Sequence, residues 1–470
     1  MKAIADPSDA LGRGLVSIRE QFQVPETFPA NVLAAAEQAS RRAPAEHSDR
    51  TSWPFVTLDP ASSTDLDQAF TIERSGADLL LHYAIADVAW FVEDGDPVDR
   101  ESWRRGTTQY LPDGRAGLYP PVLSEGAASL LPGGPRPAIV FTVRVAPDGA
   151  VRLDAAERSI IRNRSKLAYD SVRDADLPPD FAELARRIQV AEAGRGASRV
   201  NPPAQEMAAI GDGRYELLFR PPLESEVRNA ALSLATNLAV ADLLQANCTG
   251  LFRVMAEPDE RAVGRLRHTA SGLGLQWPAG ATLAEFERSL DAADPMQATF
   301  ILAIQRSSRG AGYVPFRSGE TPWHAAVAAT YAHATAPLRR LADRYVVSAA
   351  LALANGRPVP PAVSEAFEKL PAVMAKADAL GSQIQRAAVD LAESVILRGR
   401  EGESFAAIVT EVDPRGARIQ LCDLPVVARV SDSNIAPGES LRVTLVGADP
   451  ELRTVTFRPA HQSEQAPARP

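Results

Sequence analysis

The sequence predicts a mixed α+β protein that ends in a small all-β barrel, and three changes of pattern support this. Short β-rich runs dominate from Trp53 to about Arg164, and helical periodicity dominates from about 177 to 400. Short alternating runs then follow the turn Gly399–Gly402. We therefore divide the chain into an N-terminal helical element (1–50), a large mixed α/β domain (51–400), an OB-type barrel (403–460) and a disordered tail (461–470).

The first 50 residues contain two helical stretches, Ser8–Phe22 and Ala30–Arg42. Pro25 and Pro29 lie between them and prevent one continuous helix. We expect a helical lead-in or a helix-turn-helix-like element.

Five runs in the β-rich region have the length and the flanking turns of strands in one sheet. The turn Pro147-Asp148-Gly149 separates the last two, which predicts a hairpin. The five runs are Phe55–Leu58, Ala69–Glu73, Leu79–Ala86, Ala138–Ala146 and Val151–Ile161.

The helical region contains one stretch, Glu226–Asn247, that is nearly apolar throughout and is therefore expected to be buried. Thr282-Leu-Ala-Glu285 has the capping-box pattern of a helix start. Two further strands are predicted at Tyr215–Phe219 and Ala325–Tyr331, the second running directly into a helix that begins near Thr335.

Five alternating runs after Gly402, separated by Gly, Pro, Asp and Asn, predict a small OB-type barrel. The tail that follows is polar and contains proline, so we expect disorder. The runs are Phe405–Val412, Ala417–Leu421, Val426–Val430, Leu441–Val446 and Thr454–Arg458.

The net charge of −9 excludes a simple polycation that coats nucleic acid or membranes, and 45% apolar residues provide for a large core. Cys248 and Cys422 are too few for a disulfide framework or a thiolate metal cage. The chain start lacks the apolar core of a signal peptide, and the longest apolar helical stretch, Val346 to Ala354, is too short to span a membrane. We expect a cytoplasmic monomer without membrane or protein partners.

The most informative segment, Thr57–Phe70, holds three aspartates. A hydrophobic strand ends at Asp59, a Pro/Ser loop reverses the chain, and Asp65 and Asp67 project to one side because they are two residues apart. Converging carboxylates repel one another unless a hard cation neutralises them. We therefore expect Mg²⁺, or Mn²⁺, at these residues.

The alternative is that these aspartates form an ordinary solvated turn, as an isolated Asp-x-Asp pair usually does. Two observations favour a site. The 60 residues Trp53–Pro112 carry a net charge of −7. In addition, Asp87 interrupts the apolar run that begins at His82, where a buried carboxylate needs a partner or a metal.

A second cluster surrounds two adjacent arginines. We expect Thr335 to cap a helix with Pro337 in its first turn, which places Arg339 and Arg340 at the positive end of the helix dipole. Two guanidinium groups are unfavourable there unless an anion such as phosphate binds. A surface pair of Arg339 with Asp343 is the alternative. Carboxylates for metal and arginines for phosphate together indicate metal-assisted phosphodiester or phosphomonoester hydrolysis.

Six motifs stand in a fixed order along the chain: Thr57–Phe70, His82–Val88, Arg105–Pro112, Pro120–Ser124 with Ser129-Leu130, Ala235–Asn237 and Thr335–Arg340. Together they resemble the catalytic (RNB) domain of the ribonuclease II/R family of exoribonucleases. The resemblance spans about Trp53 to Arg398, and the C-terminal barrel is similar to the family's S1-type RNA-binding domain.

The resemblance implies hydrolysis of single-stranded RNA from its 3′ end, with release of nucleoside 5′-monophosphates. Asp59, Asp65 and Asp67 would hold Mg²⁺ and organise the attacking water. Arg339 would stabilise charge on the scissile phosphate, and Tyr110 would stack on the 3′-terminal base. Further RNA contacts are expected at Arg105, Arg340, His333 and Thr335.

Three features depart from the family pattern. The metal stretch usually ends in two adjacent aspartates, whereas here Asp67 is followed by Gln68, a neutral oxygen ligand that would weaken the second metal position. Ala230-Ala231 and Gln385 stand where the family tends to carry acidic residues. The usual pair of N-terminal cold-shock barrels cannot fit into about 50 residues, which suggests a more open RNA path that tolerates structured RNA.

Two other functions fit parts of the sequence. Gln68 would suit an RNA-binding protein that kept the fold while its catalysis weakened, although the retained aspartates and Arg339 argue against this. A glycosyltransferase could use Asp65 and Asp67 for a metal–nucleotide sugar, but the arginine cluster and the barrel argue against it. The segment Ser404–Ala460 holds six arginines against seven acidic residues, so its charge alone does not mark an RNA binder.

Overall fold

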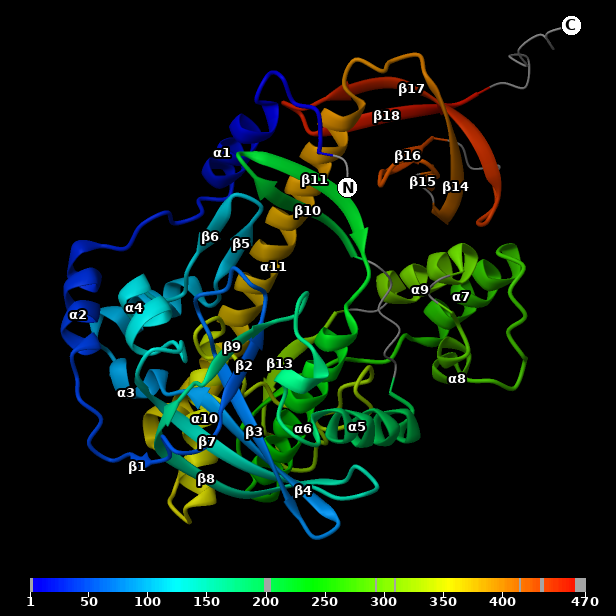
Figure 1. Cartoon of the computed structure of the whole chain (residues 1–470). Coiled ribbons are helices and arrows are strands. Elements are labelled where there is room, and N and C mark those ends of the chain that lie inside the picture. The colour runs from blue at the N-terminus through cyan, green and yellow to red at the C-terminus, as the bar shows by residue number, and fades with distance from the viewer. Residues whose placement is uncertain are drawn as a thin grey trace, which may run out of the picture.

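The computed structural model describes residues 3–197, 204–291, 294–307, 310–413, 416–431 and 435–460. Figure 1 shows a large body built around one twisted sheet, a long helix that leaves this body, and a barrel beside the helix end. The sheet and its helices share one hydrophobic core and the barrel has another, as the α+β prediction requires. Among the described residues, no helix is long and apolar enough to cross a membrane.

The main sheet has seven strands in the order β1-β8-β7-β4-β3-β2-β9. The five inner strands pair antiparallel, whereas the edge strands β1 and β9 pair parallel to their neighbours. All five predicted strands are confirmed with small shifts at their ends. The strands are β1 (Ser48–Asp49), β2 (Val56–Asp59), β3 (Gln68–Ser75), β4 (Asp78–Ala86), β7 (Pro135–Val145), β8 (Val151–Arg162) and β9 (Ser165–Ala168).

The predicted apolar helix is confirmed as α6 (Glu224–Ala246), which is buried against the sheet. α5 (Phe181–Arg195) packs along it, and α10 (Leu341–Ala354) contacts both α6 and strand β8. The middle of α6, residues 231–241, is almost entirely buried, so no exposed face there demands polar residues. Its few polar side chains therefore need specific partners.

The register of the sheet fixes the loop that joins β2 to β3. Asp59 ends β2 opposite Ala168 of β9, and Gln68 begins β3 opposite Ile85 of β4. Within the loop, Leu66 is fully buried, and its N–H and C=O bond to the Ser129 hydroxyl and to the Leu130 N–H. The loop is thus anchored in the core, and the aspartates that it carries have defined positions.

The 37-residue helix α11 (Pro361–Leu397) joins the main body to the barrel (Figure 1). Both predicted N-terminal helices are confirmed, as α1 (Ala10–Gln21) and α2 (Ala30–Ser40). However, α1 packs on α11, whereas α2 packs on α4 (Pro97–Arg105) in a different hydrophobic cluster. A helical lead-in therefore describes them better than a helix-turn-helix unit.

The remaining helices and strands include two that the sequence predicted. The capping box at the start of α8 is confirmed, because the Glu285 N–H donates to the Thr282 hydroxyl and the Thr282 N–H donates to the Glu285 carboxylate. The predicted strand Tyr215–Phe219 is confirmed within β11. The elements of the main body not yet given are α3 (Val88–Phe91), β5 (Gln109–Leu111), β6 (Gly114–Ala116), the π-helical turn η1 (Leu123–Ala127), the 3-10 turn η2 (Asp174–Asp176), β10 (Ala204–Gly211), β11 (Arg214–Arg220), β12 (Leu251–Val254), α7 (Glu260–Gly272), α8 (Leu283–Arg288), α9 (Pro295–Ser307) and β13 (Gly312–Pro315).

The predicted strand Ala325–Tyr331 is wrong. The chain turns there: His324 accepts a hydrogen bond from the Ala328 N–H, and its own N–H donates to Ala329. Ala328 has a φ of 51°, which no strand contains. Apolar alternation was present in the sequence, but it reflects a tight turn whose side chains pack on the core.

The barrel prediction is confirmed. Five strands close in the order β14-β15-β16-β18-β17, and Gly416 has a φ of 115° where a Cβ would collide with the Val430 carbonyl. The predicted disordered tail lies outside the described residues. The strands are β14 (Ser404–Asp413), β15 (Gly416–Leu421), β16 (Val427–Val430), β17 (Ser440–Asp449) and β18 (Thr454–Pro459).

The contact between α11 and the barrel predicts a pH-dependent stability. The buried Glu393 side chain accepts hydrogen bonds from the Val427 N–H at 2.7 Å and from the Gln205 amide. Burial raises the pKa of Glu393 from 4.5 to about 7, so the folded chain binds this proton more tightly than the unfolded chain does. Stability should therefore fall as the pH rises from about 4.5 to 7.

We expect Glu393→Gln to raise the free energy of unfolding by about 1–3 kcal/mol at pH 8 and to change it less at pH 5, measured by urea titration. Glu183→Gln is the matched control, because hydrogen bonds from Arg186 and Arg187 lower the pKa of Glu183 to about 2. That control should give no gain at pH 8. Equal effects of Glu393→Gln at both pH values would contradict the prediction.

Candidate active site

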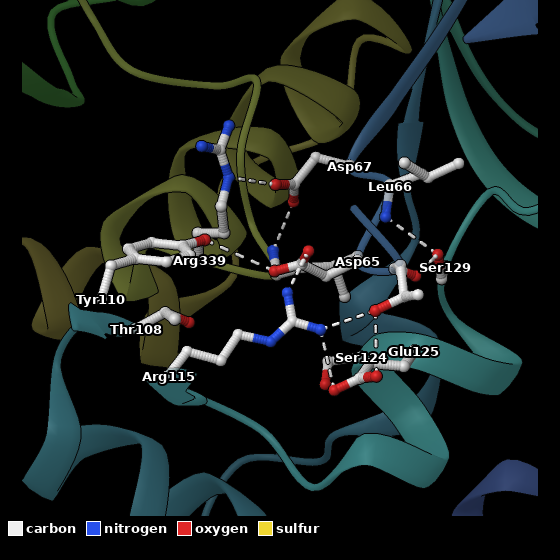
Figure 2. Close-up of polar contacts among 12 residues, drawn as sticks. Asp65, Leu66, Asp67, Thr108, Tyr110, Arg115, Ser124, Glu125, Ser129 and Arg339 are labelled. Carbon is white, nitrogen blue, oxygen red and sulfur yellow. Dashed lines mark hydrogen bonds and ion pairs between the residues drawn. The ribbon is translucent and has the colours of Figure 1, made fainter. Parts of the chain in front are cut away.

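Asp67 is the most deeply buried of the three aspartates, with 2% of its surface exposed. Its two carboxylate oxygens accept hydrogen bonds from the Leu338 N–H and from Arg339 Nε, both at 2.7 Å (Figure 2). Burial raises the pKa of Asp67 to about 7, against the lowering effect of Arg339 and the Leu338 N–H. Both donors favour the charged form, so Asp67 and Arg339 form an ion pair above about pH 7.

Asp59 lies beside this pair but has a different environment. Its Oδ2 atom is buried and has no hydrogen-bond partner within the described residues. Burial raises the pKa of Asp59 to about 6, Arg339 and Lys166 act in the opposite direction, and Asp65 raises the pKa further. Asp59 is thus a carboxylate with an acceptor oxygen left over.

Asp65 has an arginine of its own. Arg115 Nη1 bonds to Asp65, and Arg115 Nη2 bonds to the Thr64 hydroxyl at 2.7 Å and to Glu125 at 2.8 Å. Arg115 lies on β6 directly opposite Tyr110 on β5, and the Tyr110 hydroxyl lies 3.4 Å from Asp65 Oδ2. Figure 2 shows this hairpin bringing both side chains to the same carboxylate.

The helix after Arg339 begins later than predicted. Thr335 is not its N-cap: α10 starts at Leu341, and Arg340 occupies the N-cap position. The reason is Asp343, whose buried carboxylate accepts the Ala336 N–H at 2.8 Å and both nitrogens of an Arg340 fork. Asp343 thus holds the preceding loop outside the helix, and Arg340, not Arg339, is its partner.

The other predicted RNA-binding residues have partners inside the protein. The Thr335 hydroxyl lies 2.9 Å from that of Ser233, and His333 Nδ1 lies 2.7 Å from the Tyr313 hydroxyl. Burial lowers the pKa of His333 well below its usual value, so the ring is neutral. Arg105 pairs with Glu101, donates to two backbone carbonyls and covers the Phe28 ring at 3.7 Å. Their roles in RNA binding stay predictions, without support from these contacts.

The structure shows the polar partners of two further predicted positions, Gln68 and Asp87. The Tyr83 hydroxyl donates to Gln68 Oε1 at 2.6 Å, so this amide oxygen is engaged. Asp87 is buried as predicted, and its partners are His47 at 3.2 Å and Arg158 at 3.0 Å. Asp87 therefore needs no metal.

Two models of known protein families match the chain, and one of them covers this site. The model of the RNB domain matches residues 47–353, more than half of the chain, and covers the three aspartates and Arg339. The chain belongs to the RNB family. The model of the RNase II-type exonuclease C-terminal S1 domain matches residues 403–460, which form the barrel.

Curated relatives of this RNB protein are ribonucleases. Ribonuclease R of Aquifex aeolicus is 26% identical over 436 residues, which cover 86% of this chain and 61% of the relative. Ribonuclease R of Escherichia coli K12 is 28% identical over 351 residues, which cover 68% of this chain and 42% of the relative. The chain thus spans less than two thirds of the length of these relatives.

Solved structures of the RNB fold are similar over nearly the whole chain. Mycoplasma genitalium RNase R in complex with ribose methylated single-stranded RNA has a TM-score of 0.84 at 18% identity, covering 98% of this chain and 79% of that one. Yeast Ssd1, a pseudonuclease, has a TM-score of 0.67 at 16% identity, and the match covers 91% of this chain and 56% of Ssd1. At these identities the comparison establishes a shared fold and no shared activity.

Sequence reasoning missed a polar stripe on α6 that faces this RNB site. Ser225, Asn229, Ser233 and Asn237 recur every four residues along α6, which places them on one face. Asn229 donates to the Leu58 carbonyl and to the Tyr169 hydroxyl, and Asn237 supports the arginine loop through the Ala334 N–H. The four-residue spacing was visible in the sequence and could have identified the stripe.

The site fits a divalent cation at Asp59 better than a cage of three carboxylates. Among the described residues, no three acidic, histidine or cysteine side chains are grouped as a ready metal site. Asp65 and Asp67 are held by arginines, whereas Asp59 Oδ2 and the buried Asn229 Oδ1 lack donors. An orphaned carboxylate oxygen suits Mg²⁺, which binds through one or two carboxylates and keeps waters for a substrate phosphate.

The Asp67–Arg339 pair predicts a coupled loss of stability. We expect Arg339→Met to lower the free energy of unfolding by about 1–3 kcal/mol at pH 8, because Asp67 would stay buried without its cation. The loss should shrink below about pH 7, where Asp67 takes up a proton. Adding Asp67→Asn to Arg339→Met should recover part of it, as measured by urea titration in a double-mutant cycle.

Arg173→Met is the matched control, because Arg173 forms an exposed pair with Asp176. Its effect should stay within about 0.5 kcal/mol. If Arg339→Met cost no more than this control, the pair would not be the constraint that we describe.

Proposed function

We propose that this chain is an exoribonuclease that hydrolyses RNA from the 3′ end and releases nucleoside 5′-monophosphates with the help of Mg²⁺. The observation that carries the proposal is the convergence of the Asp59–Asp67 loop with Arg339 inside a matched RNB domain. Relatives named ribonuclease R and exoribonuclease 2 support the same reaction class.

Asp59 would hold the divalent cation, for which Mg²⁺ is the first choice and Mn²⁺ the second. When bound, such a cation lowers the pKa of its water and neutralises charge on a phosphate. Asp65 and Asp67 would contribute negative potential and fixed hydrogen-bond acceptors around it. Gln68 would contribute no charge, and its oxygen is occupied by Tyr83.

Arg339 has the geometry to contact the scissile phosphate. Its Nε bonds to Asp67, and Figure 2 shows the two terminal nitrogens pointing away from that carboxylate. The side chain is 41% exposed, although its partner is buried. Asp67 thus fixes the stem of Arg339 and leaves a guanidinium edge that can meet charge developing on phosphate.

Tyr110 would bind the base at the 3′ end. Its ring is 52% exposed, while its hydroxyl lies against Asp65, so an aromatic face borders the carboxylates. An aromatic face stacks on any base, which suits a nuclease that removes every nucleotide in turn.

RNA is the proposed partner, and two features bear on its form. Solved structures of Mycoplasma genitalium RNase R contain single-stranded RNA and double-stranded RNA. The matched S1 barrel supports RNA binding by this chain although its charge is nearly balanced. We therefore propose single-stranded RNA as the substrate, with structured RNA also accepted.

A second candidate function is RNA binding with weakened catalysis. Gln68 favours it, since one acidic position of the resemblance is neutral here, and the fold neighbour Ssd1 is titled a pseudonuclease. The engaged Asp67–Arg339 pair favours the enzyme, because a site without catalysis needs neither the buried charge nor the exposed guanidinium edge.

The first test is digestion of 5′-labelled single-stranded RNA with Mg²⁺. We expect a ladder that shortens from the 3′ end, no digestion in EDTA, and a loss of at least about 100-fold in rate with Asp67→Asn. Asp176→Asn, in an exposed pair far along the chain, is the control and should keep the full rate. A ladder unchanged by Asp67→Asn would refute the site.

Gln68→Asp separates the two candidate functions. If the chain is an active exoribonuclease, the unaltered protein digests RNA and Gln68→Asp changes mainly the Mg²⁺ concentration needed for half-maximal rate. If catalysis was lost with the acidic residue, the unaltered protein binds labelled RNA without digesting it. Activity that arises only in Gln68→Asp would establish the second function.

A further inference from the structure

Arg115 is placed where a cation would otherwise be required. Its guanidinium contacts Asp65 in the β2–β3 loop, Glu125 in the turn η1 and the Thr64 hydroxyl. The side chain is largely buried, and in Figure 2 it reaches from the hairpin to the floor of the aspartate loop. A fixed positive charge thus lies between acidic groups beside the proposed catalytic centre.

The three aspartates divide according to their partners. Asp67 has Arg339 and Asp65 has Arg115, each by a direct ion pair. Asp59 has a buried oxygen with no partner among the described residues. Two of the three carboxylates are therefore paired with a cation of the protein itself, Asp65 sharing Arg115 with Glu125, and only Asp59 has an oxygen left for an external cation.

Phosphodiester hydrolysis at clustered carboxylates commonly uses two divalent cations about 4 Å apart. We propose that Arg115 takes the place of one of them, so that this active site binds a single divalent cation, at Asp59. This inference rests on the proposed function and specifies how many metal ions the site holds. Gln68, a neutral residue, fits the same arrangement because fewer carboxylates suffice for one ion.

The hairpin holds Arg115 too firmly for a metal to displace it at low cost. A cation at Asp65 would have to break the contacts of Arg115 with Asp65 and Thr64 and leave Glu125 as its remaining partner. The hairpin turn is itself tied to α1, since Asp113 accepts two hydrogen bonds from Arg19, at 3.1 and 2.8 Å. An arginine keeps its charge at any working pH, so it acts as a permanent cation.

The test counts bound Mn²⁺ per chain without RNA. The chain is treated with EDTA, dialysed and titrated with Mn²⁺ at pH 8 while the EPR signal of free Mn²⁺ is recorded. We expect one tightly bound ion for the unaltered chain and none for Asp59→Asn. Arg115→Met should bind two, and the second should disappear in Arg115→Met combined with Asp65→Asn.

Two controls keep the result interpretable. Arg115→Lys retains a positive charge and should bind one ion, and Arg104→Met, an exposed arginine paired with Glu101, should also bind one. Thermal unfolding checks that each variant is folded. Should Arg115→Met not fold, the count for the unaltered chain decides.

Two ions in the unaltered chain, none at all, or one ion in folded Arg115→Met would each overturn the proposal. These outcomes are separate from the test of the proposed function. A chain that digests RNA but binds two Mn²⁺ ions would remain an exoribonuclease while Arg115 lost its role.

Discussion

The burial of one carboxylate constrains the rest of this structure. Asp67 lies in the core, where an unpaired negative charge costs several kcal/mol, and its partners come from a segment some 270 residues later in the chain. The ion pair can form only if the loop before α10 lies at the end of the sheet where β3 begins. Buried Leu66 anchors the loop that carries Asp67. Asp343 fixes the loop that carries Arg339, because its carboxylate binds Ala336 and Arg340 and keeps both residues outside the helix. Fold and site therefore share one set of contacts.

Much of this arrangement could be predicted from the sequence, because local periodicity encodes it. The five inner strands of the main sheet, the apolar helix α6 and the five barrel strands follow from alternation, turn residues and length. The edge strands β1 and β9 were not predicted. Residue types and the family resemblance predicted that the aspartates and Arg339 serve one site, but they did not predict the direct ion pair of Asp67 with Arg339. What could not be predicted depends on partners distant in sequence. Arg115 lies on β6, just after the motif Arg105–Pro112, and only the folded chain brings it to Asp65. The start of α10 was misplaced because a side chain, Asp343, competes with the backbone for the preceding N–H.

The site also shows how charge is distributed in a crowded active centre. Arginines serve two different purposes there. Arg339 is 41% exposed and pairs with Asp67 through one nitrogen, whereas Arg115 bridges Asp65 and Glu125, and Arg340 is paired with the buried Asp343. The local acidity of the sequence is therefore largely compensated within the protein, and the remaining imbalance is concentrated at Asp59. A net charge of −9 is compatible with the proposed RNA partner, because the groups proposed to contact phosphate are few and fixed.

The long helix α11 connects the main body to the barrel (Figure 1). It runs about 55 Å at the usual rise per residue, and along this length it contacts the β5–β6 hairpin, α1, the β10–β11 hairpin and the barrel strands β17 and β18. One continuous helix thus packs against the hairpin that carries Tyr110 and Arg115 and, further along, against the barrel. The length of α11 therefore sets the spacing between the barrel and the proposed catalytic centre.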